Sequence, residues 1–285
     1  MTYETLCHRL MTIYDTSEAK AIARWVFDVR FGLSLADILC GKDTQLSAND
    51  QAELEKIAQR LENGEPVQYV LGMADFCGRP FHVEPGVLIP RPETAELCQW
   101  IISQKNCPSV CSVLDIGTGS GCIAVTLALE MPEAKVTAWD ISEEALRIAQ
   151  NNAKVLGAAI TFQRRDALNP SQPTLPTPPS EPQWDIIVSN PPYIAPQERD
   201  EMEKNVLDFE PGLALFAPED NPIIFYQRIG DYALQHLTSN GMLFFELNPL
   251  TSDDVFNYLR ELGFTDIVIR QDQFGKPRFL KATKI

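Results

Sequence analysis

Residues 1–63 carry apolar side chains at the spacing of amphipathic helices. The first stripe follows i, i+3, i+4 spacing and is made of Tyr3, Leu6, Cys7, Leu10, Met11 and Tyr14. Ser17, Ser34 and Ser47 are expected to begin further helices, because a serine side chain accepts from the free N–H groups of a helix start. Stripes of this kind are typical of a packed core, so the segment predicts a small helical bundle.

The pattern changes at residue 66. Apolar residues such as Val67, Val70, Phe76 and Phe81 are now separated by Gly78, prolines and further glycines. Closely spaced apolar runs with turn residues between them predict a β-hairpin connector over residues 66–90. We therefore predict three parts, which are a helical domain at 1–65, the connector at 66–90, and a larger domain at 91–285.

From residue 91 onward, short apolar runs alternate with helical patterns. Strands are expected at 111–115, 135–140, 159–163, 184–189, 241–246, 264–270 and 277–283. Helices are expected at 95–104, 119–130, 142–156, 220–238 and 252–262. Such alternation predicts an α/β fold with a doubly wound, mostly parallel seven-stranded sheet. The last two strands have no helix between them, so they should form an antiparallel hairpin at one edge.

One segment cannot be a crossover helix. Residues 169–182 contain six prolines, and proline removes the N–H donor that a helix needs. The segment predicts an extended surface loop, with a polyproline ligand as the alternative.

The charge narrows the choice of partners. The net charge is −15, and the densest basic pair is Arg164-Arg165. Proteins that bind nucleic acid usually present a basic face to the phosphates, so a protein substrate fits better than DNA or RNA.

The remaining composition excludes other classes. The N-terminal residues have no apolar core of a signal peptide, and no apolar run approaches a membrane span, so we expect a cytoplasmic protein without membrane contact. The seven cysteines form no C-x-x-C pair, and the three histidines are scattered, so no metal site is predicted.

A glycine-rich turn follows the strand at 111–115. It reads Asp115-Ile116-Gly117-Thr118-Gly119-Ser120-Gly121, and a helical pattern comes directly after it. Glycines allow a tight turn that brings N–H groups close to a ligand. The spacing is G-x-G-x-G and not the G-x-G-x-x-G of dinucleotide sites. The next strand ends at Asp140, where an acid is placed to bind ribose hydroxyls, although it would also suit a turn or a helix cap.

A second motif follows the strand at 184–189. It reads Asn190-Pro191-Pro192-Tyr193, in which two prolines stiffen the backbone and bias Asn190 toward an extended conformation. An amide oxygen, a carbonyl and a phenol ring suit a planar –NH2 group, which needs two acceptors and an aromatic face. The tetrapeptide by itself is also compatible with a simple Pro-Pro turn.

These motifs, in this order, resemble the class I S-adenosylmethionine-dependent methyltransferases. Residues 88–94 (Leu-Ile-Pro-Arg-Pro-Glu-Thr), the glycine loop, residues 187–194 and residues 210–215 are similar to the PrmC/HemK family. Its members are peptide-chain release factor glutamine N5-methyltransferases. The resemblance covers most of the chain and implies a class I methyltransferase fold that follows an N-terminal substrate-recognition bundle.

The resemblance also implies roles for particular residues. S-adenosylmethionine, with S-adenosylhomocysteine as its product, would be bound by Gly117, Thr118, Gly119, Ser120, Gly121, Asp140, Asp166 and Asn190. The glutamine of a Gly-Gly-Gln motif would be bound by Asn190, Pro191, Pro192 and Tyr193, of which Asn190, Pro191 and Tyr193 would be catalytic. The partner is a release factor, and we expect a monomer. The sequence departs from many relatives at Ala95, Ala167 and the Asn248-Pro249 pair.

Two alternatives remain at this stage. A methyltransferase acting on the exocyclic amine of adenine or guanine would use the same tetrapeptide. A non-catalytic S-adenosylmethionine-binding or interaction module would have the helical bundle as its working part.

Overall fold

The computed structural model describes residues 1–104, 111–170 and 183–285. These residues divide into two compact units. The first comprises Met1–Met73 with Met202–Phe209, and the second comprises Ala74–Glu201 with Glu210–Ile285.

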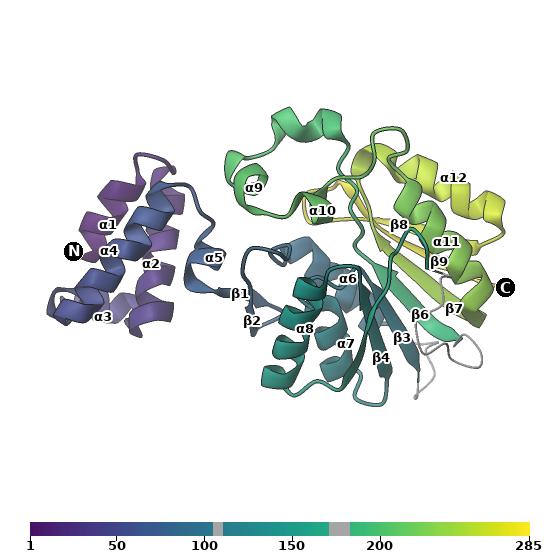
Figure 1. The fold of residues 1–285 in the computed structure, drawn as a ribbon, viewed down its shortest axis with the longest axis horizontal. Coiled ribbons are helices and arrows are strands. Elements are labelled where there is room, and N and C mark those ends of the chain that lie inside the picture. The colour runs from purple at the N-terminus through teal and green to yellow at the C-terminus, as the bar shows by residue number, and fades with distance from the viewer. Residues whose placement is uncertain (105–110, 171–182) are drawn as a thin grey trace. The chain divides into compact units, whose positions relative to one another are not determined.

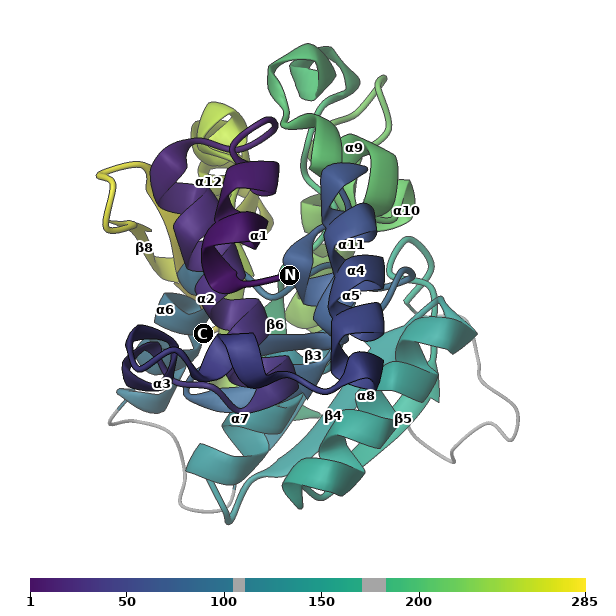
Figure 2. The ribbon, with the colours of Figure 1, turned by 90° about the vertical axis from the view of Figure 1, so that its left-hand side faces the viewer.

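The first unit is helical. Its elements are α1 (Tyr3–Leu10), α2 (Thr16–Phe31), α3 (Leu35–Leu39), the 3-10 turn η1 (Lys42–Gln45), α4 (Ala48–Glu62), α5 (Val67–Leu71) and α9 (Lys204–Phe209). Helices α1 and α2 lie side by side, and α4 packs against α1 (Figures 1 and 2). The apolar stripes meet in one core, in which Leu6, Phe27, Leu54 and Leu61 are fully buried. The predicted bundle is thus confirmed.

The helix starts follow the expected chemistry with one exception. Ser34 and Ser47 begin helices, as predicted, and both form capping boxes. The second helix begins at Thr16, and its cap is Asp15 and not Ser17. The Asp15 carboxylate accepts from the N–H groups of Ser17 and Glu18 at 2.7 and 2.9 Å. A carboxylate two residues earlier in the chain satisfies the free donors, so Ser17 is already helical.

The connector is only partly a hairpin. Val67–Leu71 forms helix α5, where strand pairing was expected. Pro66 precedes this helix, Gly72 ends it in the left-handed conformation, and Val70 joins the bundle core. Burial against the bundle overrides the β-branched local preference. The hairpin itself is shorter and consists of β1 (Met73–Phe76) and β2 (Arg79–His82).

In the described part of the second unit, seven strands form one sheet, as predicted. Its order is β5-β4-β3-β6-β7-β9-β8. The strands are β3 (Ser112–Ile116), β4 (Lys135–Asp140), β5 (Ile160–Arg164), β6 (Trp184–Ser189), β7 (Leu237–Glu246), β8 (Thr265–Gln271) and β9 (Pro277–Thr283). The first five in this order pair in parallel, while β9 pairs antiparallel to both β7 and β8. The edge hairpin is therefore confirmed.

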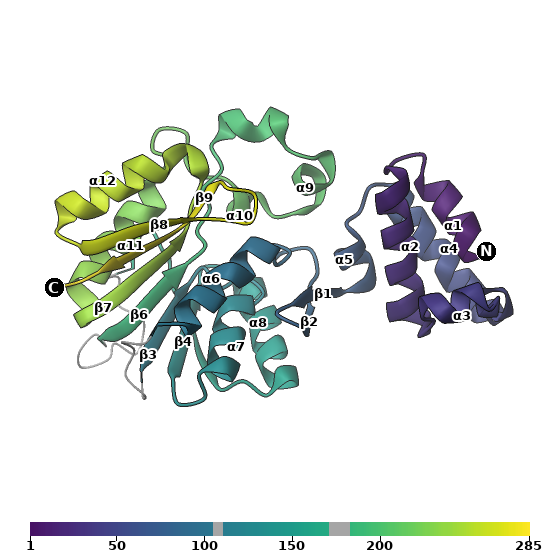
Figure 3. The same cartoon turned by 180° about the vertical axis from the view of Figure 1, so that it is seen from behind.

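Helices cover both faces of this sheet (Figures 1 and 3). The covering helices are α6 (Pro92–Ile102), α7 (Cys122–Glu130), α8 (Glu143–Leu156), α11 (Ile224–His236) and α12 (Ser252–Leu262). Side chains of α6, α7 and α8 share one core with Val113 of β3, and side chains of α11 and α12 share a second core with Leu114. Neighbouring strand residues thus point to opposite faces, as alternation in a strand requires.

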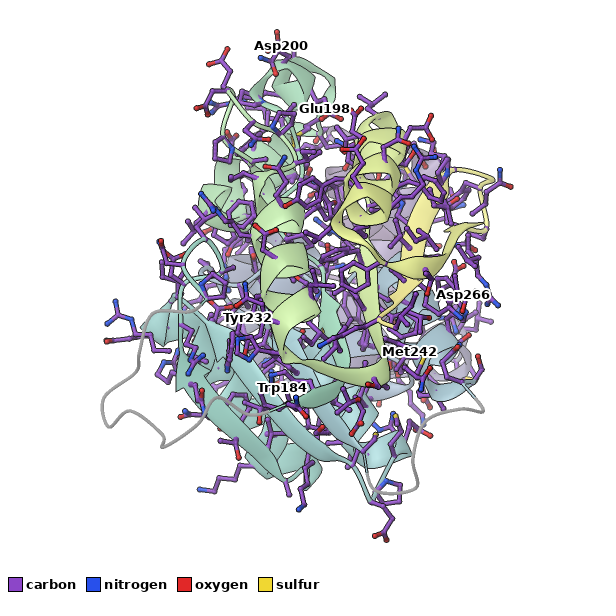
Figure 4. All side chains as sticks on the ribbon, turned by 90° about the vertical axis from the view of Figure 1, so that its right-hand side faces the viewer. Trp184, Glu198, Asp200, Tyr232, Met242 and Asp266 are labelled. Atoms are coloured by element: carbon purple, nitrogen blue, oxygen red, sulfur yellow. The ribbon has the colours of Figure 1, made fainter. Side chains whose placement is uncertain are left out.

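The second face is fixed by aromatic contacts. Figure 4 shows Trp184 of β6 close to Tyr232 of α11, and the indole Nε1 donates to the Tyr232 hydroxyl at 3.2 Å.

Helix α11 starts at Ile224, four residues later than expected, and β7 begins at Leu237, four residues earlier than expected.

Several short elements were not anticipated from the sequence. Besides η1 and α9, they include the 3-10 turns η2 (Pro196–Glu201) and η3 (Pro249–Thr251), and helix α10 (Gly212–Leu215). Most of the proline-rich segment at 169–182 lies outside the described residues. Within the described ranges, no helix has both the length and the apolar character needed to cross a membrane.

Candidate active site

The predicted motifs meet in one row at the carboxyl ends of adjacent strands. In the sheet, Ile116 pairs with both Trp139 and Ser189, and Ser189 pairs with Phe245. The Ser189 hydroxyl also donates to the Ile116 carbonyl oxygen at 2.7 Å. The residues that follow these positions are Gly117, Asp140, Asn190 and Glu246. The register therefore brings the glycine loop and the Asn-Pro-Pro-Tyr segment together, as ligand sites of open α/β sheets require.

The buried Asp115 side chain holds the glycine loop through hydrogen bonds. Its Oδ2 accepts from the Thr118 hydroxyl at 2.6 Å and from the Ala124 N–H at 3.2 Å. Burial raises the pKa of Asp115 to about 7. Its Oδ1 is buried and has no hydrogen-bond partner among the described residues. Thr118 and Ser120 are themselves buried, so this part of the motif shapes the loop from the protein side.

Asp140 closes the loop from the neighbouring strand. Its Oδ2 accepts from the Gly119 N–H and its Oδ1 from the Ser142 N–H, both at 2.9 Å. Burial raises the pKa of Asp140, while these two N–H groups oppose the shift. Each carboxylate oxygen keeps a further lone pair, so the side chain can still accept from hydroxyl groups of a ligand.

Gly119 and Gly121 of the loop have different surroundings. At Gly119, with φ of +54°, an added Cβ would meet no atom within 4 Å, so open space lies beside the backbone. At Gly121, with φ of +81°, an added Cβ would lie 3.0 Å from the Ala149 Cβ. Gly121 thus permits close packing of the α7 start against α8, while Gly119 leaves room for a bound molecule. Gly117 is similarly open.

Asp166 follows β5 at the same edge of the sheet. Its Oδ1 accepts from the Leu168 N–H and its Oδ2 from the Asn169 side-chain amide, both at 2.8 Å. The Arg165 N–H donates to the Asp140 carbonyl oxygen at 3.0 Å, which ties this turn to the end of β4. Asp166 is half-buried, and it lies two residues after Arg164, which pairs with Asp140 in the sheet.

The Asn-Pro-Pro-Tyr segment is held by contacts that the sequence did not reveal. The Asn190 Nδ2 donates to the Thr94 hydroxyl at 3.4 Å. The Tyr193 hydroxyl donates to Glu246 Oε1 at 3.2 Å. Burial, with the nearby Glu246 carboxylate, raises the pKa of Tyr193 well above its ordinary value, so the hydroxyl stays protonated and donates.

Glu246 is the buried centre of this cluster. Its Oε2 accepts from the Thr94 hydroxyl at 2.6 Å, and its main-chain oxygen accepts from the Tyr226 hydroxyl at 3.0 Å. Burial raises the pKa of Glu246, whereas Thr94 and the charge of Arg278 lower it. In the sequence, Glu246 is the last residue of the strand predicted at 241–246 and directly precedes the Leu247-Asn248-Pro249 segment, but nothing in the sequence indicated its contacts with Thr94 and Tyr193.

Asn248 holds the loop after β7 against the Asn-Pro-Pro-Tyr segment. Asn248 Nδ2 donates to the Tyr193 carbonyl oxygen at 3.0 Å and to Glu198 Oε2 at 2.8 Å. Its Oδ1 accepts from the Leu250 N–H at 2.9 Å and so caps η3. The loop after β7 therefore holds the Asn-Pro-Pro-Tyr segment through hydrogen bonds.

Residues of two segments that are distant in the sequence also form an ion pair, in which the carboxylate is buried and the guanidinium is partly exposed. The Arg91 guanidinium donates to Glu210 Oε1, and Glu210 Oε2 accepts from the Ile89 N–H at 3.1 Å. The side chain of Glu210 is 1% exposed. This pair joins residues 88–94 to residues 210–215.

Solved structures support the class that this architecture defines. The chain matches a methyltransferase from Pyrococcus furiosus with a TM-score of 0.52 and 18% identity, covering 84% of this chain and 99% of that one. It matches a 16S rRNA methyltransferase from T. thermophilus, in complex with AdoMet and guanosine, with a TM-score of 0.51 and 20% identity, covering 75% and 50%. The fold is that of a class I methyltransferase.

Sequence relatives identify the family. The PrmC N-terminal domain model matches residues 4–72, and the methyltransferase small domain model matches residues 101–208. The release factor glutamine methyltransferase of Bacteroides thetaiotaomicron is 47% identical over 277 residues, which are 96% of each chain. That of Flavobacterium psychrophilum is 36% identical over 275 residues, covering 95% and 94%. The chain belongs to the release factor glutamine methyltransferase family.

Proposed function

We propose that this enzyme transfers a methyl group from S-adenosylmethionine to the side-chain amide nitrogen of the glutamine in the Gly-Gly-Gln motif of a peptide-chain release factor. The observation that carries the proposal is the pairing of Ile116 with Ser189, since it places the glycine loop beside Asn190. Family membership supports the choice of glutamine over other planar nitrogens.

The described residues fit the methyl donor. Open space beside Gly117 and Gly119 accommodates its methionine part, and Asp140 offers acceptors to the ribose hydroxyls. Asp166 lies one strand further, where the adenine would be recognised. When bound, S-adenosylmethionine supplies an electrophilic methyl group on a sulfonium, which requires no metal.

The protein's own task is to orient a weak nucleophile. The nitrogen lone pair of an amide is delocalised into its carbonyl group. Asn190 Oδ1 and the Pro191 carbonyl oxygen accept the two amide hydrogens, which favours tetrahedral character at the nitrogen. Pro192 stiffens the segment, and the ring of Tyr193 lies against the amide plane. Such positioning supplies several kcal/mol without a covalent intermediate.

The helical unit recognises the release factor in this proposal. The match of residues 4–72 to a domain found with this family supports that role. The net charge of −15 disfavours direct nucleic-acid binding. The enzyme acts as a monomer in the cytoplasm, where translation takes place.

The decisive experiment is mass spectrometry of a release factor after incubation with the enzyme and S-adenosylmethionine. We expect a single methyl group on the glutamine of the Gly-Gly-Gln motif and none when that glutamine is replaced. A short peptide with the same motif should be methylated with a lower kcat/KM, because it lacks the surface that the helical unit contacts. Methylation of RNA or DNA in place of the release factor would contradict the proposal.

A further inference from the structure

The side chains of Glu246, Thr94 and Asn190 form a hydrogen-bonded chain that runs from the protein interior to the site. Glu246 Oε2 lies 2.6 Å from Thr94 Oγ1, and Thr94 Oγ1 lies 3.4 Å from Asn190 Nδ2. Glu246 is 2% exposed, Thr94 is 3% exposed, and Asn190 is half-buried. The chain thus links a buried carboxylate to the amide proposed to bind the substrate.

The chain has a fixed direction. A hydroxyl group carries one hydrogen, and an ionised carboxylate only accepts, so Thr94 donates its hydrogen to Glu246 in its ionised form, which the Thr94 and Tyr193 hydroxyls and the charge of Arg278 favour. The Thr94 oxygen can then act only as an acceptor toward its other neighbour. The Asn190 amide must therefore present its nitrogen to Thr94, which leaves Oδ1 without a donor among the described residues. The second contact is long, as hydrogen bonds of an active site often are before substrate binds.

A second contact keeps the same carboxylate in place. Glu246 Oε1 accepts from the Tyr193 hydroxyl at 3.2 Å, so each oxygen of Glu246 takes one hydroxyl donor. Thr94 lies on α6 and Glu246 ends β7, and neither belongs to the Asn-Pro-Pro-Tyr segment. Thr94 and Glu246 can therefore set the orientation of the Asn-Pro-Pro-Tyr segment although they lie outside it.

We propose that Glu246 and Thr94 are positioning residues that fix the orientation of the Asn190 amide, so that its oxygen and not its nitrogen faces the substrate. This inference rests on the proposed function, in which Asn190 Oδ1 accepts a hydrogen of the glutamine amide. A reversed amide would direct a donor at the donor –NH2 group and would oppose binding in the reactive orientation.

Three variants test the direction of the chain. Thr94→Val keeps the shape and removes the hydroxyl, Thr94→Ser keeps the hydroxyl, and Glu246→Gln offers a donor where only an acceptor stood. We expect Thr94→Val to lower kcat on the release factor by about tenfold or more. Glu246→Gln should lower it further, because its amide can donate to Thr94 and reverse the chain. Thr94→Ser should stay within about twofold of the wild type.

Two further measurements do not depend on turnover. Calorimetry should give the same Kd for S-adenosylhomocysteine, within about twofold, in wild type and Thr94→Val, which shows that the cofactor site is intact. NMR of the asparagine side-chain amides should show a changed Asn190 signal in Thr94→Val and an unchanged one in Thr94→Ser. The signal is assigned by its loss in Asn190→Asp.

The outcomes separate this inference from the proposed function. If the wild type does not methylate the release factor, the proposed function fails. If the wild type is active and Thr94→Val keeps its kcat within twofold, the chain does not orient Asn190. An Asn190 signal that is the same in wild type and Thr94→Val would also overturn the inference, even if Glu246→Gln does not fold.

Discussion

The side chain of Asn248 donates to the main-chain oxygen of Tyr193 at 3.0 Å, across 55 residues of sequence. Asn248 is 3% exposed, and its amide also donates to Glu198, whose carboxylate accepts from the Ala195 N–H at 2.7 Å. The backbone of the Asn-Pro-Pro-Tyr segment is thus fixed from the loop after β7. The loop after β7 is therefore part of the support of the site.

We expect Asn248→Ala to lower both stability and activity. It leaves the Tyr193 carbonyl and Glu198 without this donor, which should cost about 1–3 kcal/mol of the free energy of unfolding. A displaced tetrapeptide should lower kcat about tenfold or more. Urea unfolding and a methyl-transfer assay measure the two effects. The exposed neighbour Gln197 provides the control, since Gln197→Ala should change neither quantity. Normal kcat in Asn248→Ala would contradict the supporting role.

The affinity for the cofactor should depend on Asp140. Asp140→Ala removes the proposed ribose acceptors and also the acceptor of the Gly119 N–H. We expect S-adenosylmethionine and S-adenosylhomocysteine to bind more weakly by about 1–3 kcal/mol. Calorimetry measures this, with the exposed Glu133→Gln as the control. Unchanged affinity would remove Asp140 from the site, and binding of NADH would overturn the choice of cofactor.

Asn190 should matter for turnover more than for binding. We expect Asn190→Ala to lower kcat by roughly 10²–10³ with a smaller change in KM, because an aligned acceptor acts mainly in the transition state. Tyr193→Phe keeps the ring but removes one of the two hydroxyl donors to Glu246, so its effect should be milder than that of Tyr193→Ala, which should be severe. Steady-state kinetics with an intact release factor distinguish these results. A near-normal kcat for Asn190→Ala would refute the proposed polarisation of the glutamine amide.

Substitutions of Gly121 and Gly119 should have different effects on stability and on cofactor binding. Gly121→Ala forces a Cβ to within 3.0 Å of the Ala149 Cβ at a φ of +81°, so we expect a loss on the order of 3 kcal/mol in the free energy of unfolding. Gly119→Ala meets open space and should cost about 1–2 kcal/mol, from its positive φ alone. It should nevertheless weaken binding of S-adenosylhomocysteine more than Gly121→Ala does, provided that both variants are folded. Thermal unfolding and calorimetry give the comparison, and equal stability losses would contradict the close packing of Gly121.

Asp115 should make stability depend on pH. In the unfolded chain an aspartate has a pKa near 3.8, but burial raises the pKa of Asp115 to about 7 in the folded protein. As pH rises from about 4 to about 7, the unfolded state therefore loses a proton that the folded state keeps, and stability falls. Above pH 7 Asp115 is ionised in both states. The loss of unfolding free energy that it causes then stays constant at up to roughly 4 kcal/mol.

Asp115→Asn cannot ionise, so its free energy of unfolding should decline less across this range of pH than that of the wild type. Urea unfolding at several pH values between 4 and 8 measures the slope. The exposed Asp75→Asn should follow the wild-type curve. The same slope in wild type and Asp115→Asn would show that Asp115 is not the group responsible.

The sequence by itself determined the layers of the fold and the motifs of the site. Each depends on signals that are local in the chain. The alternation of apolar runs predicted the parallel sheet and its edge hairpin, and serine caps at Ser34 and Ser47 fixed two helix starts. The glycine loop was recognisable because glycine frees its own backbone, and the Asn190-Pro-Pro-Tyr segment was recognisable because proline restricts its own.

Only the tertiary structure decided which residues surround these motifs. Thr94 and Glu246 are separated by 152 residues, and they meet because α6 packs on the sheet beside the end of β7. Val67–Leu71 became a helix because burial in the bundle outweighs local preference. Strand register and helix packing are cooperative properties of the whole unit. They decide which partner each buried polar group finds, so the network behind Asn190 could not be read from any single segment.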